Sequence, residues 1–245
     1  MKEVIKVEQL TKSYGNFIAV DNVSLSVSRG MVFGLLGANG AGKSTTIECI
    51  LGTKNPDSGQ VSILELNPKA DRKSLFEKVG VQFQEMNYQE QIKVSELCEV
   101  TASLYQNPLN YMELLMEFGI GDKQKSLVKD LSGGQRQRLF IVLALIPNPE
   151  VVFLDELTTG LDAKASRDVW KTLMRLKEKG LTILLTSHFM DEVEALCDRI
   201  CILKKGRIVF EGTVLEAVTS SPCDKFEDAY LWYTDEEEEE ANENL

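Results

Sequence analysis

One stretch of this chain decides its fold: Gly37-Ala38-Asn39-Gly40-Ala41-Gly42-Lys43-Ser44. It fits the pattern G-x-x-x-x-G-K-[ST], in which glycines let consecutive backbone N–H groups turn inward on phosphate oxygens. The apolar run before it, Met31 to Leu36, has no helical period, whereas Thr45 to Leu51 can form a helix that ends at Gly52. We therefore expect a strand, a phosphate cradle and a helix in that order, with the positive end of the helix dipole adding to the cradle.

Two side chains of this stretch bring further chemistry. The pattern places Lys43 against the β- and γ-phosphates of a nucleotide and the Ser44 hydroxyl on Mg²⁺. The alternative is a glycine-rich turn between strand and helix that binds nothing, because such patterns also occur by chance. Motifs elsewhere in the chain are needed to distinguish a phosphate-binding loop from such a turn.

The composition is that of a globular chain without a membrane span. It has 245 residues, of which 43% are hydrophobic, enough for a substantial core. No stretch approaches the roughly 18 consecutive apolar residues of a spanning helix, and the charged N-terminus is unlike a signal peptide. We therefore expect the chain to stay in the cytosol, with its five cysteines as reduced thiols rather than disulfides or metal ligands.

The net charge of −11 is concentrated near the C-terminus. From Val218 onward ten acidic residues stand against one lysine, which gives −9 and leaves −2 for everything before. A nearly neutral body lacks the basic excess of nucleic-acid-binding proteins, so no nucleic-acid partner is expected. The segment 219–245 has no hydrophobic periodicity and is expected to be a flexible acidic tail.

Strand-like alternation marks the N-terminal region, with apolar residues at positions 5, 7 and 10 and again at 23, 25 and 27. This predicts antiparallel strands ahead of the phosphate cradle. Between them lies Tyr14, followed by Gly15. An aromatic residue in such a place is usually a loop anchor, but stacking on a nucleotide base is the alternative.

Polar residues follow two further strand patterns. The run Val79 to Gln84 predicts a strand that delivers Gln84 to its C-terminal end, where α/β sheets place their ligands. The run Val151 to Leu154 is typical of a buried parallel strand and ends in Asp155 and Glu156. In a chain with a phosphate cradle, Asp155 is a candidate anchor for Mg²⁺ and Glu156 a candidate base for the attacking water. The alternative is a pair of solvated loop acids.

Between these two strands the pattern predicts helices, with an insertion over residues 85–147. It ends with Leu131-Ser132-Gly133-Gly134-Gln135, which leads into an apolar helix that Pro147 terminates. Ser132 is suited to cap this helix, and the glycines leave its first N–H groups accessible to an anion. An ordinary capped helix start is the alternative.

The chain continues with an amphipathic helix over Ala163 to Lys179 and a buried strand over Leu181 to Thr186. Just after that strand stands His188, the only histidine, so any role that needs an imidazole falls to it. A further helix follows, and Lys204-Lys205-Gly206 then predicts the turn of a hairpin.

In this order, these motifs resemble the nucleotide-binding subunit of an ATP-binding cassette (ABC) transporter, over about Lys6 to Val218. The residues Leu131 to Gln135 match the family's signature sequence, which few other ATPases carry. The chain departs from the usual pattern at Leu157 and Ala163, where proline is frequent. The resemblance implies an α/β fold: a P-loop (RecA-like) core with an N-terminal antiparallel β subdomain and an inserted helical subdomain. It also implies one cassette over 1–218, with the β subdomain and core over about 1–84 and 148–218 and the helical subdomain over about 85–147.

The resemblance further assigns roles to individual residues. Glu156, His188 and Lys43 would be catalytic, and Ser44, Gln84 and Asp155 would hold Mg²⁺. Leu131, Ser132, Gly133, Gly134 and Gln135 would act in trans, and Asp162 would belong to the loop after the acidic pair, Thr159 to Asp162. The implied ATP-binding residues are Tyr14, Gly37, Ala38, Asn39, Gly40, Ala41, Gly42, Lys43, Ser44, Thr45 and Gln84.

What the resemblance implies about the complex is a dimer of cassettes, identical or not, that encloses two ATP molecules head to tail. Each site would join the phosphate cradle of one subunit to the signature residues of the other. The dimer would be bound to transmembrane permease subunits, and the chain would lie on the cytoplasmic face of the cell membrane through them.

The segments Thr186 to Arg199 and Gly206 to Thr213 are most similar to the ABC-2 type exporter branch. An importer-type subunit and a soluble ABC ATPase that acts as a switch on ribosomes or DNA are the alternatives. The acidic tail would be solvated, or would contact a basic cytosolic loop of the permease.

Overall fold

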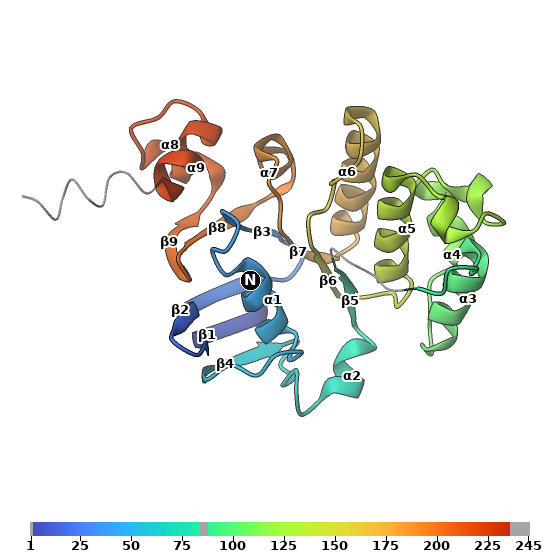
Figure 1. Ribbon diagram of the computed structural model, residues 1–245, viewed down its shortest axis with the longest axis horizontal. Helices are drawn as coiled ribbons and strands as arrows, with labels where there is room; N and C mark the ends of the chain where they lie inside the picture. Colours follow the sequence, from blue (N-terminus) through green and yellow to red (C-terminus); the bar gives the residue numbers. More distant parts are fainter. Residues whose placement is uncertain (1, 84–87, 236–245) are drawn as a thin grey trace, which may run out of the picture.

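The computed structural model describes residues 2–83 and 88–235, which form two β-sheets and the helices that cover them (Figure 1). The smaller sheet is antiparallel, with strand order β2-β1-β4. The larger sheet has the order β5-β6-β7-β3-β8-β9 and is parallel except for the edge strand β9. The strands are β1 (Glu3–Tyr14), β2 (Phe17–Ser28), β3 (Val32–Gly37), β4 (Ser58–Ile63), β5 (Val79–Gln82), β6 (Val151–Leu154), β7 (Thr182–Leu185), β8 (Arg199–Lys204) and β9 (Arg207–Gly212).

The strand arrangement follows from the sequence patterns. Strands β3, β6 and β7 are buried along their whole length, because helices or the other sheet cover both faces, and they are accordingly continuous apolar runs. Strands β1 and β2 alternate, and only one face of them is buried. The antiparallel N-terminal sheet and the hairpin at Lys205-Gly206 are both confirmed.

Helices pack between the two sheets and around the larger one. Helix α1 (Lys43–Ile50) lies between the two sheets, and its buried apolar side chains belong to the same core cluster as Phe33 and Phe153. The helical segment expected over residues 85–147 packs at the far end of the larger sheet (Figure 1). The helices are α1, α2 (Arg72–Phe76), α3 (Val94–Ser103), α4 (Tyr111–Glu117), α5 (Gly133–Leu145), α6 (Ala163–Glu178), α7 (Met190–Leu196), α8 (Val214–Thr219) and α9 (Phe226–Thr234), with 3₁₀ turns at Gly121–Lys123 and Val128–Asp130.

Helix α5 lies close against β5. A Cβ atom at Gly80 would lie 1.9 Å from the carbonyl oxygen of Ala144, so this contact requires glycine. The whole C-terminal half of α5, from Leu139 to Leu145, is buried. Packing of this half against β5 positions α5 relative to β6, the neighbouring strand that leads into the acidic pair.

The expected loss of regular structure after Val218 was wrong for Phe226–Thr234, which forms α9. Phe226 and Ala229 are buried in a cluster with Leu36 and Ile202, and Tyr230 and Tyr233 pack against it. These four aromatic and small residues recur at the spacing of one helix face, which the acidic residues between them obscure in the sequence. The residues 236–245 lie outside the described part of the chain.

Candidate functional site

The loop between β3 and α1 has a backbone that only glycine can adopt at two positions. Gly42 has φ +103°, and a Cβ atom there would lie 2.3 Å from the carbonyl oxygen of Ala19. Gly37 has φ +146°, and its Cβ would lie 2.5 Å from the carbonyl oxygen of Leu203. Gly42 is also the N-terminal cap of α1 and supplies no side-chain acceptor to the first turn. The N–H groups at this helix start therefore have no side-chain cap and are available to an anion.

Lys43 is folded back into this loop. Its Nζ donates hydrogen bonds to the carbonyl oxygens of Gly37 at 2.7 Å and Ala38 at 3.1 Å, and the residue is only 8% exposed. Burial lowers the pKa of its ammonium group, and the negative charges of Asp155 and Glu156 oppose that shift. The cation is therefore held at the loop, with two carboxylates close enough to act on it.

The acidic pair follows directly after β6, as the sequence predicts. Thr186, which follows the neighbouring strand β7, links both acids: its hydroxyl donates a hydrogen bond to Asp155 Oδ1, and its Oγ1 accepts one from the Glu156 N–H at 2.9 Å. Burial raises the pKa of Asp155, and the hydrogen bond from Thr186 opposes this rise. Glu156 has φ +52°, a left-handed conformation that is uncommon for a residue with a side chain.

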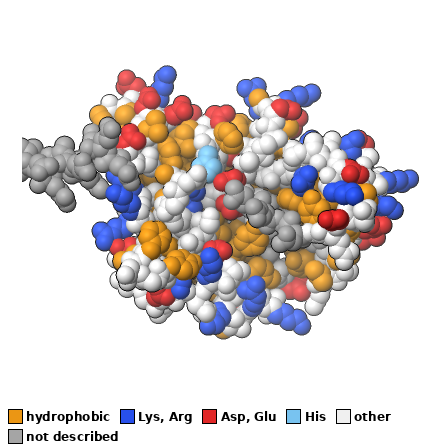
Figure 2. Space-filling model, viewed as in Figure 1, with side chains coloured by type: hydrophobic (Ala, Val, Ile, Leu, Met, Phe, Trp, Pro, Cys, Tyr) orange, Lys and Arg blue, Asp and Glu red, His pale blue; other side chains and the backbone are white. Residues whose placement is uncertain are grey.

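His188 lies against the second acid. Its Nε2 is 3.0 Å from Glu156 Oε1, and Thr159 Oγ1 is 3.4 Å from the other carboxylate oxygen. In Figure 2 the only histidine, drawn in pale blue, is visible near the middle of the face shown, with acidic side chains beside it. The structure thus brings together four candidate residues from three separate parts of the chain, namely Lys43, the pair Asp155 and Glu156, and His188.

The signature residues form the start of α5. Ser132 caps the helix, since its Oγ accepts from the Gln135 N–H at 3.3 Å while the Gln135 side chain accepts from the Ser132 N–H at 3.1 Å. Gly133 is exposed, with no atom within 4 Å of the place a Cβ would take. Gly134 instead lies against the loop after the acidic pair, where its Cβ would be 3.0 Å from the carbonyl oxygen of Gly160.

The other predicted site residues lie around this centre. Tyr14 ends β1 and is 45% exposed. The centroid of its ring is 5.6 Å from Lys12 Nζ and 5.4 Å from Lys54 Nζ. Asp162 caps α6 by accepting from the N–H groups of Lys164 and Ala165. Thr45 lies in the first turn of α1, and Gln84 lies outside the described residues.

Three polar residues near the acids were missed by the sequence reasoning. Besides Thr186, they are Gln82, which is buried and donates to the carbonyl oxygen of Asp155 at 3.0 Å, and Gln137 of α5. Gln137 donates to the carbonyl oxygens of Glu156 and Leu157. Thr186 and Gln82 do stand at the ends of strand patterns, which is the one signal that could have pointed to them.

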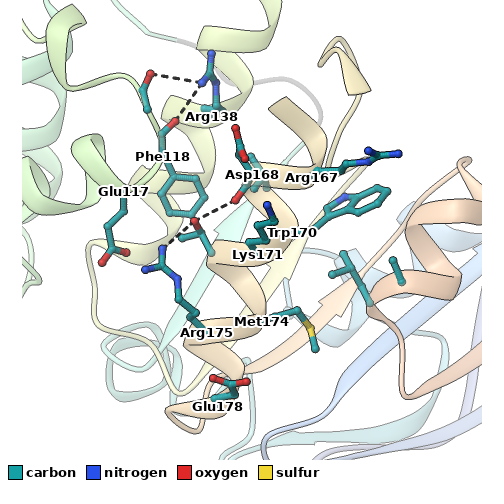
Figure 3. A pocket seen from close by; sticks show the side chains of 15 residues that line it. Glu117, Phe118, Arg138, Arg167, Asp168, Trp170, Lys171, Met174, Arg175 and Glu178 are labelled. Carbon is teal, nitrogen blue, oxygen red and sulfur yellow. Dashed lines mark hydrogen bonds between the residues drawn. The ribbon is translucent and has the colours of Figure 1, made fainter. Parts of the chain in front are cut away.

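A cavity of about 780 Å³ lies elsewhere, between α6, α7 and the end of α4 (Figure 3). Trp170, Lys171 and Arg175 of α6 line it, and Arg138 bonds to the carbonyl oxygens of Phe118 and Gly119 at its edge. None of the predicted site residues lines this cavity.

A glycine loop between strand and helix, a lysine held in it and an acidic pair at a nearby strand end define a P-loop nucleotide-binding protein. Residues 20–159 match the family model described as ABC transporter. The chain belongs to this family, whose cassettes are the ATPases of transporters. The fold expected from the resemblance is confirmed.

Curated relatives are named Nod factor export ATP-binding protein I. The protein of Ralstonia nicotianae is 39% identical over 230 residues, which cover 91% of this chain and 72% of that protein. The protein of Mesorhizobium japonicum is 41% identical over 208 residues, which cover 83% of this chain and 61% of that protein. The chain thus matches somewhat under two thirds to almost three quarters of these relatives' lengths.

Solved structures agree with this assignment. The ATP-binding subunit of an ABC transporter superposes with a TM-score of 0.87 at 27% identity, covering 95% of this chain and all of that one. A dimeric bacterial ABC transporter cassette gives a TM-score of 0.76 at 27% identity, covering 85% of this chain and 98% of that one. Among the described residues, no helix is long and apolar enough to cross a membrane.

Proposed function

We propose that this chain binds and hydrolyses ATP to power the export of a substrate through separate transmembrane subunits. The observation that carries the proposal is the set of contacts around Glu156: its carboxylate is 3.0 Å from His188, its N–H is held by Thr186, and its charge acts on Lys43. A carboxylate that an imidazole and a fixed backbone orient beside a phosphate loop is suited to activate water for phosphoryl transfer.

Each part of the site has a task in that reaction. The backbone of Gly37 to Thr45 would bind the phosphates, and Lys43 would exchange its two carbonyl partners for phosphate oxygens. Glu156 would accept a proton from the attacking water while His188 holds the carboxylate in place. Tyr14 would stack on the base, since its ring is exposed.

The residues present also fit Mg²⁺. Asp155 offers a carboxylate and Ser44 an exposed hydroxyl, both of them the oxygen donors that this ion prefers, and Mg²⁺ commonly takes its remaining ligands from phosphates and water. Asp155 and Ser44 would hold the ion, with Gln84 as a further ligand, and the ion would neutralise phosphate charge.

The signature residues supply the second half of a site. Gly133 and Ser132 are exposed at the start of α5, and the dipole of this 13-residue helix favours an anion there. In a two-fold dimer of cassettes, this helix start would meet the γ-phosphate of the ATP bound by the other subunit. The solved dimeric cassette supports such an assembly, of two identical chains or two different ones.

The direction of transport rests on the relatives, whose printed names state export. On this proposal the chain is a peripheral component on the cytoplasmic face of the membrane, where permease subunits hold it. Copurification with a polytopic membrane protein would support this placement. Copurification with ribosomes or DNA would instead favour a soluble switch.

The test of ATP hydrolysis uses Glu156→Gln, which keeps the shape of the side chain and removes the base. We expect this variant to bind ATP as tightly as the wild type, to remain dimeric with ATP and to lose turnover. Glu150→Gln serves as the control because Glu150 pairs with Arg29 on the surface. Unimpaired hydrolysis by Glu156→Gln would refute Glu156 as the base, and absence of ATP binding by the wild type would refute the proposal itself.

A further inference from the structure

Gln137 joins helix α5 to the backbone at the acidic pair. It lies on α5, one turn beyond the helix cap at Ser132. Its Nε2 donates to the carbonyl oxygen of Glu156 at 3.0 Å and to that of Leu157 at 2.9 Å. Because both N–H groups of one amide are used on adjacent carbonyls, a flipped amide would place its oxygen against two acceptors. The orientation of the side chain is therefore determined by the contact.

The backbone of Glu156 is held from both sides. Thr186 accepts from its N–H at 2.9 Å, and Gln137 donates to its carbonyl oxygen. Its φ of +52° is costly for a residue with a side chain, so the surroundings must maintain it. The next residue, Leu157, is fully buried, and its carbonyl is the second acceptor of Gln137. The Glu156 carbonyl oxygen also accepts from the Thr159 N–H at 3.2 Å. Loss of Gln137 would therefore remove the donor to this carbonyl that α5 supplies.

The direction of the Glu156 side chain depends on this backbone. Its Oε1 meets His188 at 3.0 Å, a contact that a rotation of the peptide would disturb. Gln137 and Ser132 are five residues apart on the chain, a rise of about 7.5 Å along a helix axis. The helix start and the backbone of the acid are therefore joined through this short length of α5.

We propose that Gln137 is a positioning residue for ATP hydrolysis: it fixes the peptide of Glu156 and joins it to the helix that presents the signature residues. The inference rests on the proposed function, because it concerns the same site. It adds that binding of the partner subunit's ATP at Ser132 and Gly133 affects the position of Glu156, the base of this subunit's own site. The two ATP sites of a dimer are then coupled through α5.

The test compares Gln137→Glu and Gln137→Ala with Gln124→Ala. Glutamate keeps the shape but presents a carboxylate to two carbonyls, and alanine removes the contact altogether. Gln124 is a matched control because its Nε2 makes a single hydrogen bond, at 3.3 Å, to the carbonyl oxygen of Gly121 in the helical segment. We expect both Gln137 variants to lower kcat about tenfold or more, with the Kd for ATP within about twofold of the wild type. We expect Gln124→Ala to leave both unchanged.

Two further measurements distinguish a positioning role of Gln137 from a role in stability alone. Gln137→Ala should keep its cooperative thermal unfolding, so a loss of kcat at unchanged ATP affinity cannot come from unfolded protein. In the Glu156→Gln background, the Gln137 substitution should produce no further loss of the residual rate, because it acts through Glu156.

Three results would overturn the inference. They are an unchanged kcat in both Gln137 variants, a loss of ATP affinity equal to the loss of kcat, or fully additive effects in the double variant. If the wild type hydrolyses ATP and Glu156→Gln does not, the proposed function stands even when Gln137 fails these tests.

Discussion

Replacing Thr186 by valine removes one hydroxyl that serves both acids of the site. Valine has nearly the same shape, and Thr186 is fully buried, so no water can take the place of the hydroxyl without rearrangement. The variant leaves Asp155 Oδ1 without its donor and the Glu156 N–H without its acceptor. Both hydrogen bonds are partly buried, so each group left unpaired costs about 1 kcal/mol, the lower end of the range for such groups, and we expect a loss of about 2 kcal/mol in the free energy of unfolding.

The loss should depend on pH in a definite direction. Burial already raises the pKa of Asp155, and the hydrogen bond from Thr186 works against that rise. Its removal raises the folded-state pKa further. An acid whose pKa is higher in the folded than in the unfolded state binds more protons when folded, so its stabilising effect is present at low pH and is lost as the pH rises. The destabilisation by Thr186→Val should therefore be larger at pH 8 than at pH 5.

Urea unfolding at the two pH values, followed by circular dichroism, measures both effects. Thr172→Val is the control, because Thr172 is also buried, but its hydroxyl donates to the Asp168 carbonyl within the same helix and accepts only from Arg175, whose exposed side chain can bind water instead. This control should cost about 1 kcal/mol or less. A Thr186→Val variant within about 0.5 kcal/mol of the wild type at pH 8, or one more strongly destabilised at pH 5, would refute the reasoning.

Three further substitutions test other parts of the structure. Glu192→Gln replaces a buried carboxylate whose pKa is raised by burial and keeps the acceptor for Trp170 Nε1. The melting temperature of this variant should exceed that of the wild type by roughly 2–4 °C at pH 8 and by less at pH 5, and an equal gain at both pH values would contradict this. Gly80→Ala brings a Cβ within 1.9 Å of the Ala144 carbonyl oxygen and should lower the free energy of unfolding, measured in urea, by about 3 kcal/mol or more. Gly133→Ala should lower it little because the surroundings of Gly133 are open, and equal losses in the two variants would refute the packing argument. Tyr14→Ala should weaken ATP binding, measured by calorimetry, roughly tenfold to a hundredfold, and Tyr14→Trp should restore it; unchanged affinity in the alanine variant would exclude the stacking role.

The parts of the fold that local patterns determine could be predicted. The strand before Gly37, the alternation in β1 and β2 and the cap at Ser132 all depend on residues close together in the sequence. The meeting of the acidic pair with Lys43 was predictable as well, because parallel strands place their C-terminal ends at one edge of a sheet.

Other contacts could not be predicted, because they join residues that only the packed structure brings together. Nothing local marks Thr186 as the partner of both acids or Gln137 as the donor to Glu156, since threonine and glutamine have no fixed role in a strand or a helix. Helix α9 was missed because its acidic residues resemble a solvated tail, while Phe226 finds its place only against Leu36 and Ile202 of distant strands.

The central claim is that each ATP site joins the phosphate cradle of one subunit to the signature residues of the other, and complementation between two inactive variants tests it. Lys43→Ala disables the phosphate cradle, and Gly133→Asp places a negative charge at the helix start that is to meet the partner's ATP. In a mixed dimer, one site would combine both defects and the other would be intact. We predict that each variant alone is inactive and that an equal mixture regains up to about a quarter of the wild-type ATPase activity, which is the share of intact sites after random pairing in a symmetric dimer. Coupling of the two sites through α5 would lower this value. A mixture as inactive as its components would contradict a site shared between two copies of this chain.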